Sequence, residues 1–258
     1  MITWHSTRQP LCAALLTACM ASGHAAQAPQ QRIGNLLWDA HEVTVGQVQA
    51  YATATGFVSQ AERAGGGMVY EAGWTQKPGW TWRAPYGQPA AANEPAAHLT
   101  FNEARAICQH AGKRLPTDAE WVNAAYQEQR PQPTAPFVNG KRYRYPNGDQ
   151  ATGSNFLNSG TPVARSVPAN ALTRGRGHAP VMSTTPGVNG LWDMGGNLWE
   201  WVDSGATTSP ITRGASWWYG PERQVEDDVA TKPMDTAVVY IGFRCVQAIA
   251  KSNTNVVL

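Results

Sequence analysis

Apolar residues recur at helical spacing in three segments of the chain, and each segment begins with the same polar signature. In each, a threonine is followed three residues later by glutamine or glutamate, which is the pattern of a capping box. The three threonines are Thr44, Thr100 and Thr117. The pattern predicts helices that begin directly after these residues. Gly56 and Gly112 are placed to end the first two of them.

Between these helices the apolar runs are short and turn residues are frequent. Runs at 36–38, 212–218, 238–240 and 243–249 fit short strands. Trp199 and Trp201 alternate along a further extended segment, which predicts that both face the core. The 25 glycines and 18 prolines leave most of the chain to turns and loops, packed by aromatic side chains. We therefore expect one loop-rich α+β domain over residues 31–250, followed by a frayed tail at 251–258.

The charge distribution argues against nucleic-acid binding, and the lengths of the apolar runs argue against a membrane-spanning helix. The net charge is only +2, and the basic residues form no stripe or cluster, so we expect no nucleic-acid binding. No run of eighteen apolar residues occurs, so a membrane-spanning helix in the mature protein is not expected. The chain is instead predicted to be a globular protein with a packed core.

The first 28 residues have the layout of a secretory signal peptide, with an apolar run at 11–21 followed by small residues. Residues 16–19 end in Cys19 and also resemble a bacterial lipobox, in which cleavage precedes the cysteine and a lipid is attached to it. An ordinary cleavage near Ala25 or Ala28 is the alternative. Either interpretation predicts export to the bacterial periplasm, and the lipobox adds membrane attachment through Cys19.

Two cysteines remain after the signal segment, Cys108 and Cys245. An even pair in an oxidising compartment predicts a disulfide. The alternative is a pair of buried free thiols.

Six segments, in order, resemble the formylglycine-generating enzyme family, also called the sulfatase-modifying factor family. The most diagnostic string is GKRLPTDAEW at 112–121, and GLWDMGGNLWEW at 190–201 is similarly specific. The others lie at 41–45, 79–83, 95–108 and 241–245. The resemblance covers nearly all of the chain after the signal segment. It implies an α+β fold similar to a C-type lectin and a disulfide that pairs Cys108 with Cys245.

The same resemblance shows a loss at the active site. The family has two reactive cysteines, spaced C-x-x-x-x-C, at positions that correspond to Tyr219 and Gln224. A phenol and an amide cannot replace a thiolate as nucleophile or soft metal ligand. The resemblance therefore implies no formylglycine-generating activity and no copper. Ser216 and Glu222 would complete a vestigial cleft, in which Ser216 is a hydrogen-bonding residue.

The cleft is also the candidate site for a ligand or partner. The aromatic and basic residues expected to line it are Trp82, Arg83, Trp217, Trp218 and Tyr219.

The family also binds calcium, and the resemblance places one site on the side chains of Asp193 and Glu200 with the carbonyls of Gly196 and Leu198. Carboxylate and carbonyl oxygens suit this hard cation. The alternative is that the two acids cap loop N–H groups. A second, weaker site would include Asn155 and Phe156, but its acidic partner is replaced by threonine.

Two classes of function fit these observations. The first is an exported binding or accessory protein whose partner is a protein or small molecule of the cell envelope. By analogy with modified relatives, it would neutralise a partner in a secretion or toxin–immunity system. The second is a periplasmic enzyme with different chemistry on the same cleft, such as an oxidation in siderophore maturation. Tyr219, Ser216 and Glu222 would then be the first residues to mutate.

Overall fold

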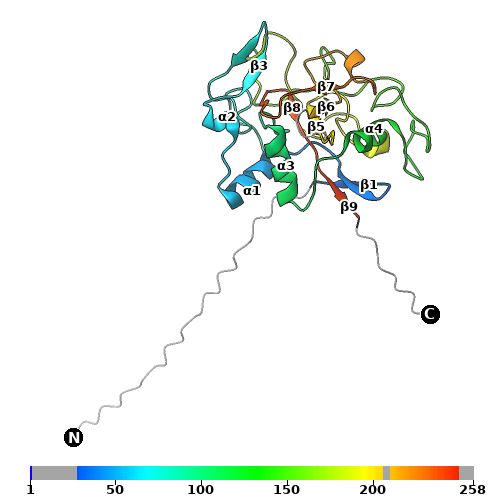
Figure 1. Ribbon diagram of the computed structural model, residues 1–258, viewed down its shortest axis with the longest axis horizontal. Helices are drawn as coiled ribbons and strands as arrows, with labels where there is room; N and C mark the ends of the chain where they lie inside the picture. The colour runs from blue at the N-terminus through cyan, green and yellow to red at the C-terminus, as the bar shows by residue number, and fades with distance from the viewer. Residues whose placement is uncertain (2–27, 206–209, 250–258) are drawn as a thin grey trace.

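The computed structural model describes residue 1 and residues 28–205 and 210–249. The predicted signal segment with Cys19 and the predicted tail lie outside the described residues, so both remain predictions. Among the described helices, none has the length and apolar character needed to cross a bilayer. Figure 1 shows short helices and small sheets joined by long loops, as the pattern of apolar runs predicts.

The three predicted helices begin where their threonines place them. They are α1 (Val45–Thr55), α3 (Phe101–His110) and α4 (Asp118–Tyr126), and each has both hydrogen bonds of its capping box. A fourth, α2 (Gln60–Arg63), uses the same box between Ser59 and Glu62 and was not predicted. Local side-chain chemistry therefore determines where the helices start.

In the part of the chain that the structure describes, the strands form three small sheets. One has the order β1-β2-β9, with β1 at Gln30–Ile33, β2 at Leu36–Asp39 and β9 at Val246–Ala248. A hairpin pairs β3 (Met68–Tyr70) with β4 (Trp74–Gln76). The third has the order β7-β6-β5-β8, from β7 (Ala230–Thr231), β6 (Ile211–Arg213), β5 (Trp199–Val202) and β8 (Ile241–Gly242). Two 3-10 turns, η1 (Val188–Gly190) and η2 (Pro221–Arg223), complete the elements.

Two predicted strands differ from the structure over most of their length, and the run at 243–249 is a strand only at 246–248. The run at 212–218 is a strand only as far as Arg213, because Gly214 and Ala215 adopt left-handed backbone angles of φ +91° and +62°. The run at 238–240 forms only an isolated bridge from Val238 to Met68. Both segments are buried, so their apolar residues pack in loops rather than in a sheet.

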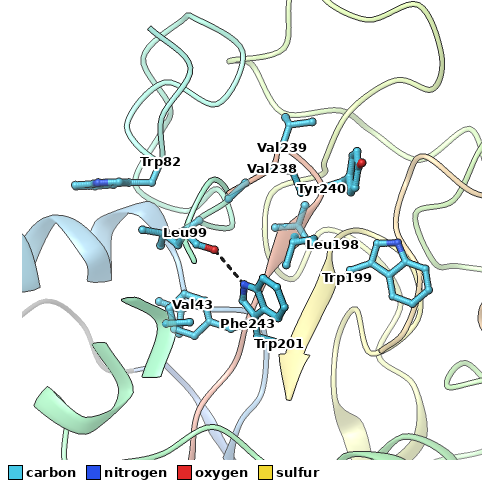
Figure 2. Packing of buried hydrophobic residues seen from close by; sticks show 14 of the residues in the cluster. Val43, Trp82, Leu99, Leu198, Trp199, Trp201, Val238, Val239, Tyr240 and Phe243 are labelled. Atoms are coloured by element: carbon cyan, nitrogen blue, oxygen red, sulfur yellow. Dashed lines mark hydrogen bonds between the residues drawn. The ribbon is translucent and has the colours of Figure 1, made fainter. Parts of the chain in front are cut away.

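Aromatic side chains fill the core between α1, α3 and β5. Figure 2 shows Trp199 and Trp201 on β5, both buried as their alternation predicts. The indole N–H of Trp201 donates to the carbonyl of Leu99 at 3.0 Å, which satisfies its polar group inside the core. Trp82, Tyr240 and Phe243 belong to the same cluster.

A disulfide joins α3 to the end of the chain. Cys108 and Cys245 are bonded, with their Cα atoms 5.6 Å apart. The bond spans 137 residues of sequence. It therefore holds the second predicted helix against the segment that leads into β9.

Candidate functional site

The loop after β6 carries the residues that correspond to the family's active site. It turns sharply because Gly214 lies against other backbone: a Cβ there would be 2.5 Å from the carbonyl oxygen of Met194. Ser216 follows and is completely buried, and its hydroxyl accepts a hydrogen bond from the Trp218 N–H at 3.3 Å. Ser216 thus holds the loop and is not exposed as a nucleophile.

The aromatic cleft expected from the sequence is wrong at three of its five residues. Trp82, Trp217 and Trp218 are 0%, 1% and 4% exposed and belong to the core. Trp217 packs edge-on against Trp218 at 5.4 Å between ring centres, which leaves neither ring open to a ligand. The fourth residue, Arg83, lies over the Trp82 ring at 4.1 Å and pairs with Glu62. Of the three aromatic residues after Ser216, Tyr219 alone is half-exposed.

Gln224, at the second cysteine position, lies entirely inside the protein. Its Oε1 accepts from the Ser154 hydroxyl at 3.0 Å, while its Nε2 has no partner among the described residues. A Cβ on Gly195 would be 2.7 Å from that Oε1, so the amide is packed closely under the 193–198 turn. Glu222, the last residue of the expected cleft, is exposed.

Tyr219 replaces the first cysteine, and its ring contacts other aromatic rings. It lies 5.8 Å from Trp199 and 6.4 Å from Tyr240, and the Arg223 guanidinium is 4.9 Å from its centre. Burial raises the pKa of the Tyr219 phenol above its usual value, although Arg223 and Arg174 partly oppose this. The phenol therefore stays protonated at neutral pH and is suited to donate a hydrogen bond.

Residues from distant parts of the sequence surround Tyr219. Tyr70 on β3 is close enough to raise the pKa of both Tyr219 and Tyr240. We call the group Tyr70, Tyr219, Arg174, Arg223 and Lys232 the Tyr219 surface. Four of its members, Tyr70, Arg174, Arg223 and Lys232, were not predicted, because no local pattern connects positions 70, 174 and 232 to the loop at 219–224.

The Tyr219 surface has an excess of positive charge. Arg223 forms an ion pair with Asp228. Within the described ranges, neither Arg174 nor Lys232 forms an ion pair. Burial lowers the pKa of Lys232, and the nearby Arg223 lowers it further. Two cations without a paired acid favour an anionic group on a ligand.

A buried network of hydrogen bonds holds the loop that carries Arg174 in place. His178 lies four residues further on, where its Nε2 is 2.9 Å from Glu94 and its Nδ1 is 3.0 Å from the Tyr86 hydroxyl. Because a carboxylate only accepts, the Nε2 atom carries the proton, and the Tyr86 hydroxyl then donates to Nδ1. Ser166 also donates to Glu94, so both ends of the loop are tied to one carboxylate.

The predicted calcium ligands lie in a second buried centre. Glu42, Asp193 and Glu200 surround Arg244, and we call these four residues the acid cluster. Both carboxylate oxygens of Glu200 accept from Arg244, and its Oε2 also accepts from the Trp121 indole at 2.8 Å. Glu200 is therefore fully occupied by protein donors.

Asp193 is placed differently. Its Oδ1 accepts from the Thr184 hydroxyl at 2.7 Å, but its Oδ2 is buried without a partner among the described residues. Burial is the main cause that raises the pKa of Asp193 to about 6. Burial also raises the pKa of Glu42 well above its usual value, and the charges of Asp193 and Glu200 add to this.

This arrangement fits the calcium prediction at Asp193 but not at Glu200. Three carboxylates around one guanidinium, with the Oδ2 atom of Asp193 free, fit a nearby cation. Glu200 does not fit as a ligand here, and no group of three or more His, Cys, Asp or Glu side chains in the described part of the chain is placed to hold a metal. The oxygens of Glu42 also accept from the Asn197 amide and the Leu198 N–H. At the weaker site, the carbonyls of Asn155 and Phe156 already accept backbone hydrogen bonds. The calcium sites remain predictions.

Comparison with known proteins gives one family. The model of the sulfatase-modifying factor enzyme 1-like domain matches residues 17–249. The formylglycine-generating enzyme of Thermomonospora curvata is 33% identical over 213 residues, 70% of this chain and 66% of that protein. The inactive C-alpha-formylglycine-generating enzyme 2 of Bos taurus is 31% identical over 179 residues, 64% of this chain and 55% of that protein. The chain thus spans between half and two thirds of the length of these relatives.

A solved structure gives the same architecture. PvdO from Pseudomonas aeruginosa superposes with a TM-score of 0.56 at 20% identity, covering 83% of this chain and 80% of that one. At this identity the likeness shows the fold alone. From the family match and the shared α+β fold together, the chain belongs to the sulfatase-modifying factor family.

Proposed function

We propose that the protein is an exported binding or accessory member of this family without formylglycine-generating activity. The observation that carries the proposal is the pair Tyr219 and Gln224. One is a protonated phenol packed among rings, and the other is an amide buried under the 193–198 turn. The two cysteines among the described residues, Cys108 and Cys245, are bonded to each other. No thiolate is therefore available at the loop for the family's reaction.

The Tyr219 surface is the proposed contact region. Tyr70 is 46% exposed, and Trp74 across the same hairpin is 55% exposed, so aromatic surface is available to a partner. Aromatic residues and arginine are the side chains most often responsible for binding energy in protein interfaces. Arg174 and Lys232 add positive charge without a paired acid, which favours a partner that presents carboxylates.

The proposed location is the bacterial periplasm, and the partner is a protein or small molecule of the cell envelope. Attachment through a lipid on Cys19 is part of the proposal. A role in neutralising a secreted or toxic partner is one form that such binding would take.

A pull-down from envelope extract tests the proposal. The tagged wild-type protein is compared with the double variant Arg174→Glu/Lys232→Glu, and Arg32→Glu on β1 serves as a matched control because its side chain is exposed outside the Tyr219 surface. We expect one stoichiometric partner that the double variant loses and the control keeps. Capture by both variants, or no partner in any sample, would contradict the proposal.

The second candidate is an enzyme with other chemistry at Tyr219. It is supported by the half-exposed phenol at the position of a family nucleophile and by the active enzymes among the relatives. Tyr219→Phe removes only the hydroxyl. A folded Tyr219→Phe protein that keeps its partner but loses its cellular phenotype would favour catalysis over binding.

We also propose that a single calcium ion is bound next to Asp193, through its free Oδ2 and nearby backbone carbonyls, with a structural role. The excess of buried negative charge in the acid cluster supports it. Calorimetry with calcium on the EGTA-treated protein is the direct test, and the absence of heat and of a thermal shift would contradict it.

A further inference from the structure

A groove of about 540 Å³ lies apart from the Tyr219 surface and shares no residue with it. Its walls come from β1, from the loops near 134–137 and 147–152, and from the segment 185–192. The residues that the argument uses are Gln31, Arg130, Phe137, Asn147, Thr185 and Trp192, and we call the site the β1 groove. Its volume lies within the range of small-molecule sites in proteins.

The β1 groove combines apolar and polar lining and carries no unpaired charge among the described residues. Among the described residues that line it, Arg130 alone is charged, and it donates two hydrogen bonds of 2.8 Å to the Glu128 carboxylate. Glu128 itself is buried, and its pKa is lowered by hydrogen bonds from Arg130 and Asn189 that outweigh burial. The groove therefore offers little to an ionic ligand and suits a neutral one.

Its polar side chains match hydroxyl groups. Gln31 and Asn147 present amides, and Thr185 presents a hydroxyl; each of these groups can both donate and accept a hydrogen bond. A sugar hydroxyl has the same dual capacity. Two rings, Trp192 and Phe137, also line the groove, and the Arg130 guanidinium lies over the Phe137 ring at 5.7 Å. A pyranose has an apolar C–H face that packs on aromatic rings of this kind.

The groove is fixed before any ligand arrives. The backbone N–H of Trp192 donates to Ala40 at 2.8 Å, and its carbonyl accepts from Arg244 in the acid cluster at 2.7 Å. The Asn147 amide donates to the Thr185 carbonyl at 3.1 Å and so links two walls. Preorganised walls lower the entropy cost of binding.

The floor of the groove requires a glycine. Gly190 has φ +71°, and a Cβ there would be 3.0 Å from an Arg130 guanidinium nitrogen. The residue thus provides both the left-handed backbone and the space for Arg130.

An extended peptide is the main alternative, because β1 is an edge strand. However, η1 lies beside β1, so the free edge is covered in part and is poorly placed to accept another strand. We propose that the β1 groove binds a neutral saccharide of one to a few sugar rings. This site would add glycan recognition to whatever the Tyr219 surface binds.

Titration of the whole exported chain with cellotriose and with the trimer of N-acetylglucosamine tests the proposal, followed by calorimetry and by tryptophan fluorescence. We expect saturable binding of at least one of the two sugars. The variants Trp192→Ala and Phe137→Ala should each weaken it tenfold or more. Trp74→Ala is the matched control, since Trp74 is an exposed tryptophan outside the groove, and it should bind as the wild type does.

Thermal melts establish that the variants are folded. Phe137→Ala is the safeguard, because Phe137 lies in a half-exposed loop and does not contact the acid cluster as Trp192 does. No binding of either sugar at millimolar concentration would overturn the proposal. So would binding that both groove variants retain, or binding of an uncharged peptide such as a Gly-Ser-Asn hexamer in place of the sugars. None of these results depends on the pull-down at the Tyr219 surface.

Discussion

Arg244 donates hydrogen bonds to both carboxylate oxygens of Glu200, at 2.9 and 2.8 Å from Nε, and both side chains are fully buried. The pair joins β5 to the segment between β8 and β9. Arg244 also donates to the carbonyl of Trp192 and so fixes a wall of the β1 groove. A buried ion pair of this kind stabilises little as a whole, but removing one partner leaves an isolated buried charge.

Arg244→Met should therefore destabilise the protein by about 3–5 kcal/mol, measured by guanidinium chloride unfolding. The loss leaves Glu200 and Glu42 without their compensating cation. Arg114→Met is the matched control: Arg114 pairs with Glu120 through two 2.7 Å hydrogen bonds, but its side chain is partly exposed. The control should cost about 1 kcal/mol or less. Equal effects of the two variants would contradict the role assigned to the buried pair of Arg244 and Glu200.

Asp193→Asn should change how stability depends on pH. The folded-state pKa of Asp193 is raised from 3.8 to about 6, so the folded protein binds this proton more tightly than the unfolded chain does. The contribution is present below about pH 4 and is lost as the pH rises to about 6, and it amounts to at most about 3 kcal/mol. In calcium-free buffer at pH 7 to 8, the amide should therefore raise the unfolding free energy.

The contribution of His98 makes the unfolding free energy change with pH in the opposite direction. Burial lowers its pKa to about 4, so its contribution is present at higher pH and is lost as the pH falls from about 6.5 to about 4. Because both the wild type and Asp193→Asn contain His98, its contribution cancels when their unfolding free energies are compared at each pH. If calcium binds as proposed, adding it should stabilise the wild type and leave the variant unchanged. A variant with the wild-type pH profile would contradict the role assigned to Asp193.

Replacing Cys108 and Cys245 by alanine should lower stability by an amount set by the length of the closed loop. For a loop of 137 residues, the chain-entropy model gives about 5 kcal/mol as an upper figure. Denaturant unfolding of the double variant against the oxidised wild type measures it. A loss below about 1 kcal/mol would show that the unfolded chain is hardly restricted by the bond.

Two substitutions of Gln224 test whether its side-chain amide is shielded from water. Gln224→Met keeps the shape and removes both the Ser154 hydrogen bond and the unpartnered Nε2, so the net change should stay within about 1 kcal/mol. Gln224→Glu introduces a buried charge and should cost several times as much, on the order of 3 kcal/mol or more at pH 8. If the glutamate variant is as stable as the methionine variant, the site is more open to water than the structure indicates.

The helices could be predicted from sequence because their signals are local. Each capping box lies within four residues. The strings at 112–121 and 190–201 identify the family, and the family predicts the fold. The candidate site was harder, because its contacts connect distant segments. Glu200 was assigned to calcium since nothing near it in sequence shows that Arg244 occupies its oxygens.

The same reason explains the tryptophans after Ser216. A run of three aromatic residues does not show which of them face inward, and the turn at Gly214 and Ala215 decides it by directing Trp217 and Trp218 into the core. Tyr70 and Arg174 come near Tyr219, and Lys232 comes near Arg223, only through the folded loops. Their positions near the Tyr219 loop could not be predicted from their separation in the sequence.

The antiparallel pairing of β2 with β9 has a consequence for how the molecule is made. Residues 36–38 find their partners only at 246–248, almost the full length of the described chain away. The first sheet therefore cannot be completed on the ribosome until residues 246–248 have been synthesised, and contacts this far apart in sequence slow folding. Until β9 emerges, the edge of β2 that it will pair with stays open to other contacts, such as those with a chaperone.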